Sequence, residues 1–152
     1  MPKIDISKLS ARTGTNYPDA FKPVVKGREK TALGDAVGLT QFGVNLTRIK
    51  PGAASALRHW HENEDEFVYI LEGELVLVED EGEAMLRAGD CAGFKANVAN
   101  GHHLVNRSSS DALYLEIGTR APSERAHYPD VDLEFERDGK DVKILHKDGK
   151  PY

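Results

Sequence analysis

An all-β sandwich or barrel is the fold class that this 152-residue sequence predicts. Its apolar residues fall in short runs rich in β-branched and aromatic side chains, which are typical of strands. Fourteen glycines and seven prolines separate these runs, and no amphipathic pattern extends far enough for a helix of more than two turns. Many short strands divided by turn residues are typical of sandwiches and barrels.

The first expected strands lie between residues 38 and 78. The range 38–49 is rich in β-branched residues and ends at the turn residues 50–52, which are Lys-Pro-Gly. The apolar run 67–71 is followed by Glu-Gly-Glu at 72–74 and by Leu-Val-Leu-Val at 75–78. This spacing predicts a β-hairpin made of two strands and a glycine turn.

Further strands are expected up to residue 119. An Asp-Glu-Gly turn at 80–82 precedes a short segment around 84–86, and Ala-Gly-Asp at 88–90 begins the next strand. The ranges 102–106 and 112–119 follow as strands on either side of a polar loop.

The end of the chain predicts a second hairpin. Residues 132–137 and 141–146 flank an Asp-Gly pair, and Asp-Gly between two alternating runs is a strong hairpin signal. No linker composition divides the chain. We therefore expect one β-barrel domain over residues 26–152, with this C-terminal hairpin, preceded by an N-terminal arm over residues 1–25.

The composition narrows the class of protein. A hydrophobic fraction of 39% and a charged fraction of 30% are ordinary for a soluble globular domain. A net charge of −5 with scattered Lys and Arg argues against nucleic acid as a partner. No run approaches the roughly 20 apolar residues that span a bilayer, and no signal-peptide pattern is present. Cys91 is the only cysteine, so we expect it to be a small core residue in a reducing compartment, the cytoplasm.

The segment Arg-His-Trp-His at 58–61 carries the main candidate site. Residues two apart on a strand point to the same face, so His59 and His61 place two imidazoles side by side. Glu66 begins the next apolar run and suits a third ligand, and His102 could supply a fourth from across a barrel. Three imidazoles and one carboxylate suit a divalent ion such as Zn, Fe, Mn, Ni or Cu.

These residues and the glycines around them resemble the first motif of the cupin superfamily. That motif is Gly, about five residues, His-x-His, three or four residues, Glu, six residues and Gly. Here Gly52 begins it, His59 and His61 follow after six residues, and Glu66 and Gly73 complete it. Only the first gap departs from the pattern, by one residue.

A second cupin motif is matched less closely. The family pattern is Gly, five residues, Pro-x-Gly, two residues, His, three residues and Asn. This chain has Gly89, Lys95 where proline is usual, and Asn97 where glycine is usual. Four residues then lead to His102, and three more lead to Asn106.

The resemblance covers the core 52–106 and implies a cupin fold, which is a jelly-roll double-stranded β-barrel. It implies one divalent metal ion per chain, such as Zn, Mn, Fe or Ni, held by three histidines and a glutamate: His59, His61, Glu66 and His102. His103 is the alternative to His102, because only one of two adjacent residues can face the barrel interior. The spacing to Asn106 favours His102.

The sequence is also similar to stand-alone bacterial cupins of the cupin-2 type, some of which are labelled sugar-phosphate isomerases. This resemblance implies a metal-dependent isomerase, epimerase or lyase for a sugar-like or oxygen-chelating organic acid, with Glu66 as a carboxylate that moves a proton. An iron-dependent dioxygenase and a non-catalytic barrel for a metal or small ligand are the alternatives. We expect a homodimer, because exposed sheet edges need covering and the N-terminal arm 1–25 could lie across the barrel of a second subunit.

Other polar residues have assigned expectations. Glu64 and Asp65 either orient a histidine N–H or belong to a solvated acidic turn. His127 and His146 lack ligand spacing and are expected at the surface. The sequence leaves open whether three basic residues that could hold a phosphate lie inside or outside the barrel: Arg48, Lys95 and Arg107.

Overall fold

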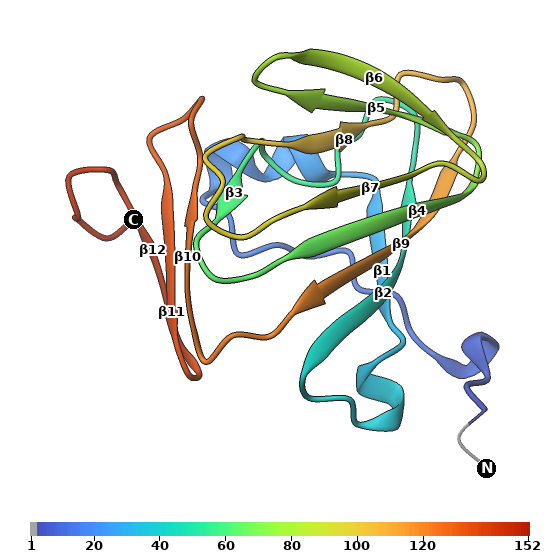
Figure 1. Cartoon of the computed structure of the whole chain (residues 1–152), viewed down its shortest axis with the longest axis horizontal. Helices are drawn as coiled ribbons and strands as arrows, with labels where there is room; N and C mark the ends of the chain where they lie inside the picture. Colours follow the sequence, from blue (N-terminus) through green and yellow to red (C-terminus); the bar gives the residue numbers. More distant parts are fainter. Residues whose placement is uncertain (1–2) are drawn as a thin grey trace.

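The computed structural model describes residues 3–152, whose strands form three antiparallel sheets (Figure 1). The five-stranded sheet has the order β1 (Arg28–Ala32), β2 (Phe42–Ile49), β9 (Ala112–Thr119), β4 (Glu66–Glu72) and β7 (Cys91–Phe94). The three-stranded sheet has the order β6 (Gly82–Arg87), β5 (Glu74–Glu79) and β8 (His103–Val105). The four-stranded sheet has the order β12 (Asp141–Leu145), β11 (Glu134–Asp138), β10 (Ser123–His127) and β3 (Trp60–His61). The described helices are short 3-10 turns, η1 (Ile6–Lys8), η2 (Asp19–Val25) and η3 (Asp35–Val37), so the all-β prediction is confirmed.

The main core lies between the five-stranded and three-stranded sheets, which face each other in Figure 1. Alternate residues of each strand turn inward, as the two-residue period of a strand requires. Burial of this apolar surface stabilises the fold by about 25 cal/mol per Å². The buried residues of this core are Ile49, Ala53, Val68, Ile70, Leu75, Leu77, Leu86, Leu104, Ala112 and Tyr114.

A second apolar cluster joins the four-stranded sheet to the N-terminal arm. Tyr17 and Phe21 of the arm pack against buried residues that include Tyr128 and Leu133. Nearer the N-terminus, the backbone of Arg12 bridges to Lys30 of β1. Residues 12–25 therefore lie along their own barrel and cover the β1 edge in part. The boundary between an arm at 1–25 and a barrel at 26–152 stays a prediction, and residues 1–2 lie outside the described residues.

The hairpin predicted over residues 67–78 was wrong. Strand β4 pairs with β7 and β9, whereas β5 pairs with β6 and β8, so the two consecutive strands belong to different sheets. Gly73 lies at the bend between them with φ +74°, and a Cβ there would lie 2.7 Å from the Asp111 carbonyl oxygen. A glycine between two apolar strands has the same sequence signal whether the chain returns in one sheet or crosses to another.

The C-terminal hairpin prediction is confirmed. Strands β11 and β12 pair in antiparallel register from Glu134 opposite Leu145 to Asp138 opposite Asp141. The hairpin extends into β10 and β3, and β3 carries His61. The end of the chain is therefore connected to the candidate site through one continuous sheet.

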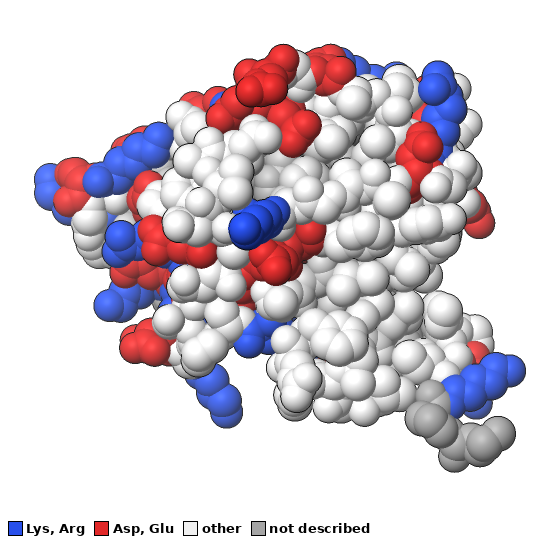
Figure 2. Space-filling view, viewed as in Figure 1, with Lys and Arg blue, Asp and Glu red and all other residues white. Residues whose placement is uncertain are grey.

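The surface separates charged and uncharged areas. Figure 2 shows acidic side chains gathered over the β5–β6 turn and a broad uncharged area over β4 and β7. Cys91 is exposed on β7, so its predicted core position was wrong. Ala92 and Phe94 are the β7 residues that pack against the core. No helix among residues 3–152 is long and apolar enough to cross a membrane.

Candidate metal centre

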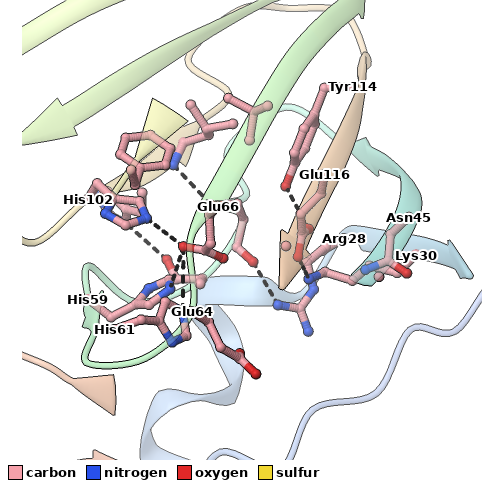
Figure 3. A pocket seen from close by; sticks show the side chains of 18 of the residues that line it. Arg28, Lys30, Asn45, His59, His61, Glu64, Glu66, His102, Tyr114 and Glu116 are labelled. Carbon is pink, nitrogen blue, oxygen red and sulfur yellow. Dashed lines mark hydrogen bonds and ion pairs between the residues drawn. The ribbon is translucent and has the colours of Figure 1, made fainter. Parts of the chain in front are cut away.

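Three imidazoles converge on one carboxylate oxygen. Nε2 of His102 lies 2.8 Å from Oε2 of Glu66. Nε2 of His61 lies 3.4 Å from that oxygen, and Nε2 of His59 lies 3.7 Å from it. Figure 3 shows the three rings grouped around the end of the Glu66 side chain. The structure thus brings together all four residues that the sequence singled out.

Backbone pairing explains how separate parts of the chain meet here. His59 and His102 form an antiparallel bridge, in which each backbone N–H donates to the other residue's carbonyl at 3.2 and 2.9 Å. His61 lies on β3, and Glu66 is the first residue of β4 in the five-stranded sheet. The rings of His59 and His61 have centroids 4.9 Å apart, as expected for one face of an extended segment.

The geometry shows which of the adjacent residues His102 and His103 lies in the cluster around Glu66. The His102 ring stacks on Phe94 with centroids 3.6 Å apart and points its Nε2 to Glu66. The His103 ring is hydrogen-bonded through Nδ1 to the Ala56 carbonyl, at 2.8 Å. Leu104 and Asn106 are buried like His102, which agrees with the expected inward face. His102 therefore belongs to the cluster, and its role as a metal ligand stays a proposal.

The second motif lacks the usual glycine, and the residue in its place adopts the backbone conformation that glycine favours. Asn97 occupies the position where glycine is usual, and it has φ +59°, the one positive φ of a non-glycine residue among residues 3–152. Asparagine adopts this left-handed region more readily than most residues. The Asn97 N–H donates to the His61 carbonyl at 2.8 Å, so the altered turn still ties the two motifs together.

The Nδ1 atoms of the three rings, which point away from Glu66, have different surroundings. Nδ1 of His59 is 2.7 Å from the Leu57 carbonyl, and Nδ1 of His102 is 3.4 Å from the Asn100 carbonyl. Such contacts fix the tautomer and the direction of the other nitrogen. Nδ1 of His61 is buried without a hydrogen-bond partner among the described residues.

Glu124 faces that unpartnered nitrogen. Its Oε1 lies 4.0 Å from Nδ1 of His61, and its side chain is fully buried. The carboxylate accepts backbone N–H groups of Glu62, Asn63 and Arg125 at 2.7 to 3.2 Å. Glu124 comes from β10, far along the chain, and no spacing signal in the sequence could have indicated it.

Two acidic residues expected to orient a histidine have other partners. Glu64 forms an ion pair with Arg137 and accepts the Ala121 N–H. Asp65 accepts the Ala96 N–H at 2.7 Å. Among residues 3–152, neither carboxylate forms a hydrogen bond with a histidine of the cluster, although Glu64 lies near His61. Their role in orienting a histidine stays a prediction.

Two other histidines are less exposed than expected. The His127 side chain is 23% exposed, because it contacts Glu62 and Glu134 and stacks on Trp60. His146 is hydrogen-bonded to Asp132 and stacks on Tyr152, so it too is part-buried. Among residues 3–152, neither ring forms a hydrogen bond or an ion pair with Glu66, which agrees with their exclusion from the predicted ligands.

The histidines control the charge of Glu66. Burial raises the pKa of this carboxyl, but hydrogen bonds from His102, His59 and His61 outweigh burial and hold the pKa well below its usual range. Burial lowers the pKa of His61, and the neighbouring carboxylates of Glu66 and Glu124 reverse that effect and raise it. Glu66 is therefore an anion at neutral pH, as a metal ligand must be.

The donor set fits a divalent metal. The ligand atoms of His59, His61 and Glu66 all lie within 4.8 Å of one another, and His102 contacts the same carboxylate. Imidazole nitrogens with one carboxylate are the donors that Zn, Fe, Mn and Ni accept. A second group that meets the same distance condition consists of His61, Glu64 and Glu124.

A cavity of about 360 Å³ lies against this cluster. Its other walls include Arg28 and Lys30 of β1 and Tyr114 and Glu116 of β9, and Figure 3 shows these side chains beside the cluster. Tyr114 and Glu116 belong to the range 112–119 that the sequence predicts as a strand. Three basic residues that also line the cavity were not predicted from the sequence: Arg12, Arg28 and Lys30.

The basic residues considered from the sequence lie elsewhere. Arg48 is part-buried and pairs with Asp111 at 3.5 Å, and the exposed Arg107 pairs with Glu83 at 2.7 Å. Lys95 lines a smaller cavity of about 220 Å³ on another side of the cluster.

A small β-barrel with a cluster of three histidines and one glutamate beside a cavity is the class that this fold and site define. The family model of the cupin domain, Cupin_2, matches residues 45–118. A sugar phosphate isomerase of the cupin superfamily from Silicibacter pomeroyi is 47% identical, with a TM-score of 0.96, over 99% of this chain and 96% of that protein. The chain therefore belongs to the cupin superfamily.

Two further solved structures are similar. A protein from Acidithiobacillus ferrooxidans, named provisionally as a sugar phosphate isomerase, is 30% identical with a TM-score of 0.75, over 82% of this chain and 80% of that one. A polyketide cyclase from Streptomyces resistomycificus has a TM-score of 0.64 at 19% identity, over 78% of this chain and 79% of that one, and shows the fold alone. A search of curated proteins found no match.

Proposed function

We propose that this cupin is a metal-dependent isomerase or epimerase of a small, sugar-like substrate with neighbouring oxygen atoms. The observation that carries the proposal is the convergence of three imidazoles on one oxygen of Glu66 beside a cavity. The names of the two relatives at 47% and 30% identity support isomerisation over the lyase alternative.

The residues of the cluster have defined roles in this proposal. His59, His61, His102 and Glu66 hold one divalent ion, which when bound supplies Lewis-acid polarisation of a substrate oxygen. The Leu57 and Asn100 carbonyls orient two of the rings. The walls of the cavity exclude bulk water from a small bound substrate and hold its carbon chain near the cluster.

Proton transfer is assigned to carboxylates. Isomerisation between neighbouring carbons takes a proton from one carbon and returns it to the next, so one carboxylate can act as base and then as acid. Glu66 is the proposed group, since its three histidine contacts involve Oε2 and Oε1 is left for a substrate. Glu116 is a second carboxylate in the cavity, where it is paired with Lys30 at 2.9 Å.

The test uses purified protein loaded in turn with Zn, Mn, Fe and Ni. Each form is incubated in deuterated water with a panel of aldose and ketose phosphates and their unphosphorylated parents. The expected result is product with deuterium next to the carbonyl carbon, lost in Glu66→Ala. Glu116→Gln, which leaves the four residues of the cluster unchanged, shows whether the second carboxylate is also needed for proton transfer.

Two other results would contradict the proposal. Ligand binding without turnover under every metal would favour a non-catalytic binding barrel. Oxygen consumption by the iron form, with no isomerisation by any form, would favour a dioxygenase.

A further inference from the structure

Only some of the basic residues that line the main cavity form ion pairs with carboxylates. Five of them line it: Arg12, Arg28, Lys30, Arg120 and Arg137. Three of these have a carboxylate partner, because Lys30 pairs with Glu116, Arg120 with Asp35 and Arg137 with Glu64. Among residues 3–152, the structure gives no carboxylate partner to Arg12 or Arg28. The cavity therefore holds two arginines that form no ion pair among these residues, the part-buried Arg28 and the exposed Arg12.

Arg28 is part-buried and held in place by neutral groups. Its Nη1 donates to the Ser55 carbonyl at 2.6 Å, and its Nη2 donates to the Gly14 carbonyl at 3.4 Å. A guanidinium has five N–H donors in a planar fork, so most of its donors remain available. A cation removed from water and left without a counter-charge is costly, and an anionic ligand would remove that cost.

The strand geometry gathers the cations on one wall. Arg28 and Lys30 lie two residues apart on β1 and share a face. Arg12 is directly opposite Lys30 in an antiparallel bridge, which places its side chain on that face too. Figure 3 shows Arg28 reaching from β1 toward the side of the pocket that holds the histidines. Ser55, which fixes Arg28, belongs to the loop that leads to His59.

We propose that Arg28, assisted by Arg12, forms an anion-binding subsite of this cavity that takes the phosphate or carboxylate group of the substrate. Arginine binds both groups through two parallel N–H donors. The ligand is then a small metabolite with an anionic group at one end and neighbouring oxygens at the end that meets Glu66 and the histidines. This subsite rests on the proposed function, because it takes the cavity to be the substrate pocket.

The experiment measures anion binding with and without metal. Calorimetric titrations of metal-free and metal-loaded full-length protein use inorganic phosphate, ribose 5-phosphate, its uncharged parent ribose and the carboxylate ribonate. Ribose 5-phosphate or ribonate is expected to bind at least about tenfold more tightly than ribose, and whichever binds more tightly identifies the anion. Arg28→Met is expected to weaken that anion about 10- to 100-fold, the range for a charge-assisted pair of hydrogen bonds.

Matched variants keep the test specific. Arg107→Met changes the net charge by the same amount at an exposed position outside the cavity, and it should leave anion affinity within about twofold of the wild type. Arg28→Lys keeps the charge and should recover part of the affinity. Melting temperatures show whether each variant is folded.

The outcomes separate the subsite from the proposed reaction. Loss of anion affinity in folded Arg28→Met, in metal-free protein as well, supports the subsite even if no turnover is ever found. Equal binding of ribose and both anions, or equal affinities in Arg28→Met and Arg107→Met, would overturn the subsite and leave the metal proposal standing.

Discussion

Replacement of Glu124 by glutamine tests how the candidate metal centre is held. Glu124 is fully buried and faces Nδ1 of His61 across 4.0 Å. When a metal takes Nε2 of His61, the proton belongs on Nδ1, where the carboxylate stabilises it and aims the ring. Glu124→Gln keeps the size of the side chain and removes the negative charge. We therefore expect weaker metal binding in a protein that still folds.

The distance between Glu124 and His61 sets an upper limit on the loss of metal-binding free energy. Two full charges 4 Å apart interact by about 4 kcal/mol at an effective dielectric constant of 20. A metal-bound imidazole carries only part of a charge, and three backbone N–H groups already balance Glu124. The loss should therefore be well below that limit, at about 1.4 to 2.7 kcal/mol, or 10- to 100-fold in affinity.

The assay is competition for Zn against a chromophoric chelator, combined with the visible spectrum of the Co-loaded protein. Glu134→Gln is the matched control, because Glu134 contacts His127, a histidine outside the cluster. The control should bind Zn like the wild type. A folded Glu124→Gln protein with Zn affinity within about twofold of the wild type, and an unchanged Co spectrum, would refute the reasoning.

Three further predictions concern the fold and assembly. Gly73→Ala should lower the free energy of unfolding in urea by about 3 kcal/mol or more. Gly38→Ala has a similar φ of +72° and open space around the added Cβ, so it should cost only about 1–2 kcal/mol. Equal losses in the two variants would contradict the role of the Asp111 carbonyl. Burial raises the pKa of three tyrosine hydroxyls, Tyr17, Tyr114 and Tyr128. Because the unfolded chain loses these protons first, stability should be complete below about pH 10 and fall above it; melting curves independent of pH from 9 to 11 would count against this. A homodimer remains our prediction, since Phe67, Tyr69 and Leu71 are exposed on one face of β4; a monomeric mass in light scattering at micromolar concentration would contradict it.

Local geometry explains why much of the site could be predicted. Two histidines in alternate positions of an extended segment must share a face, and both rings indeed meet Glu66. The spacing of Gly52, the two histidines, Glu66 and Gly73 indicated Glu66 as the third candidate ligand and pointed to the family. His102 was predicted as a member of the site from its three-residue spacing to Asn106 in the sequence. Asn106 is buried, and its side-chain amide donates to the Ile49 and Ser110 carbonyls, which holds the loop after β8.

The remaining residues depend on strand register between distant parts of the chain. Glu124 reaches His61 because β10 pairs with β3, and Arg28 enters the cavity because β1 pairs with β2 at the sheet edge. No local pattern encodes either pairing. The wrong hairpin has the same origin, because Gly73 gives no sign of which sheet receives the next strand.

The most direct measurement of the central claim is elemental analysis of tag-free protein beside His102→Ala and His103→Ala. We predict about one divalent metal ion per chain in the wild type, loss of that metal in His102→Ala, and its retention in His103→Ala. The contradicting result is wild-type protein without metal after reconstitution with each candidate ion, or metal that His103→Ala loses and His102→Ala keeps.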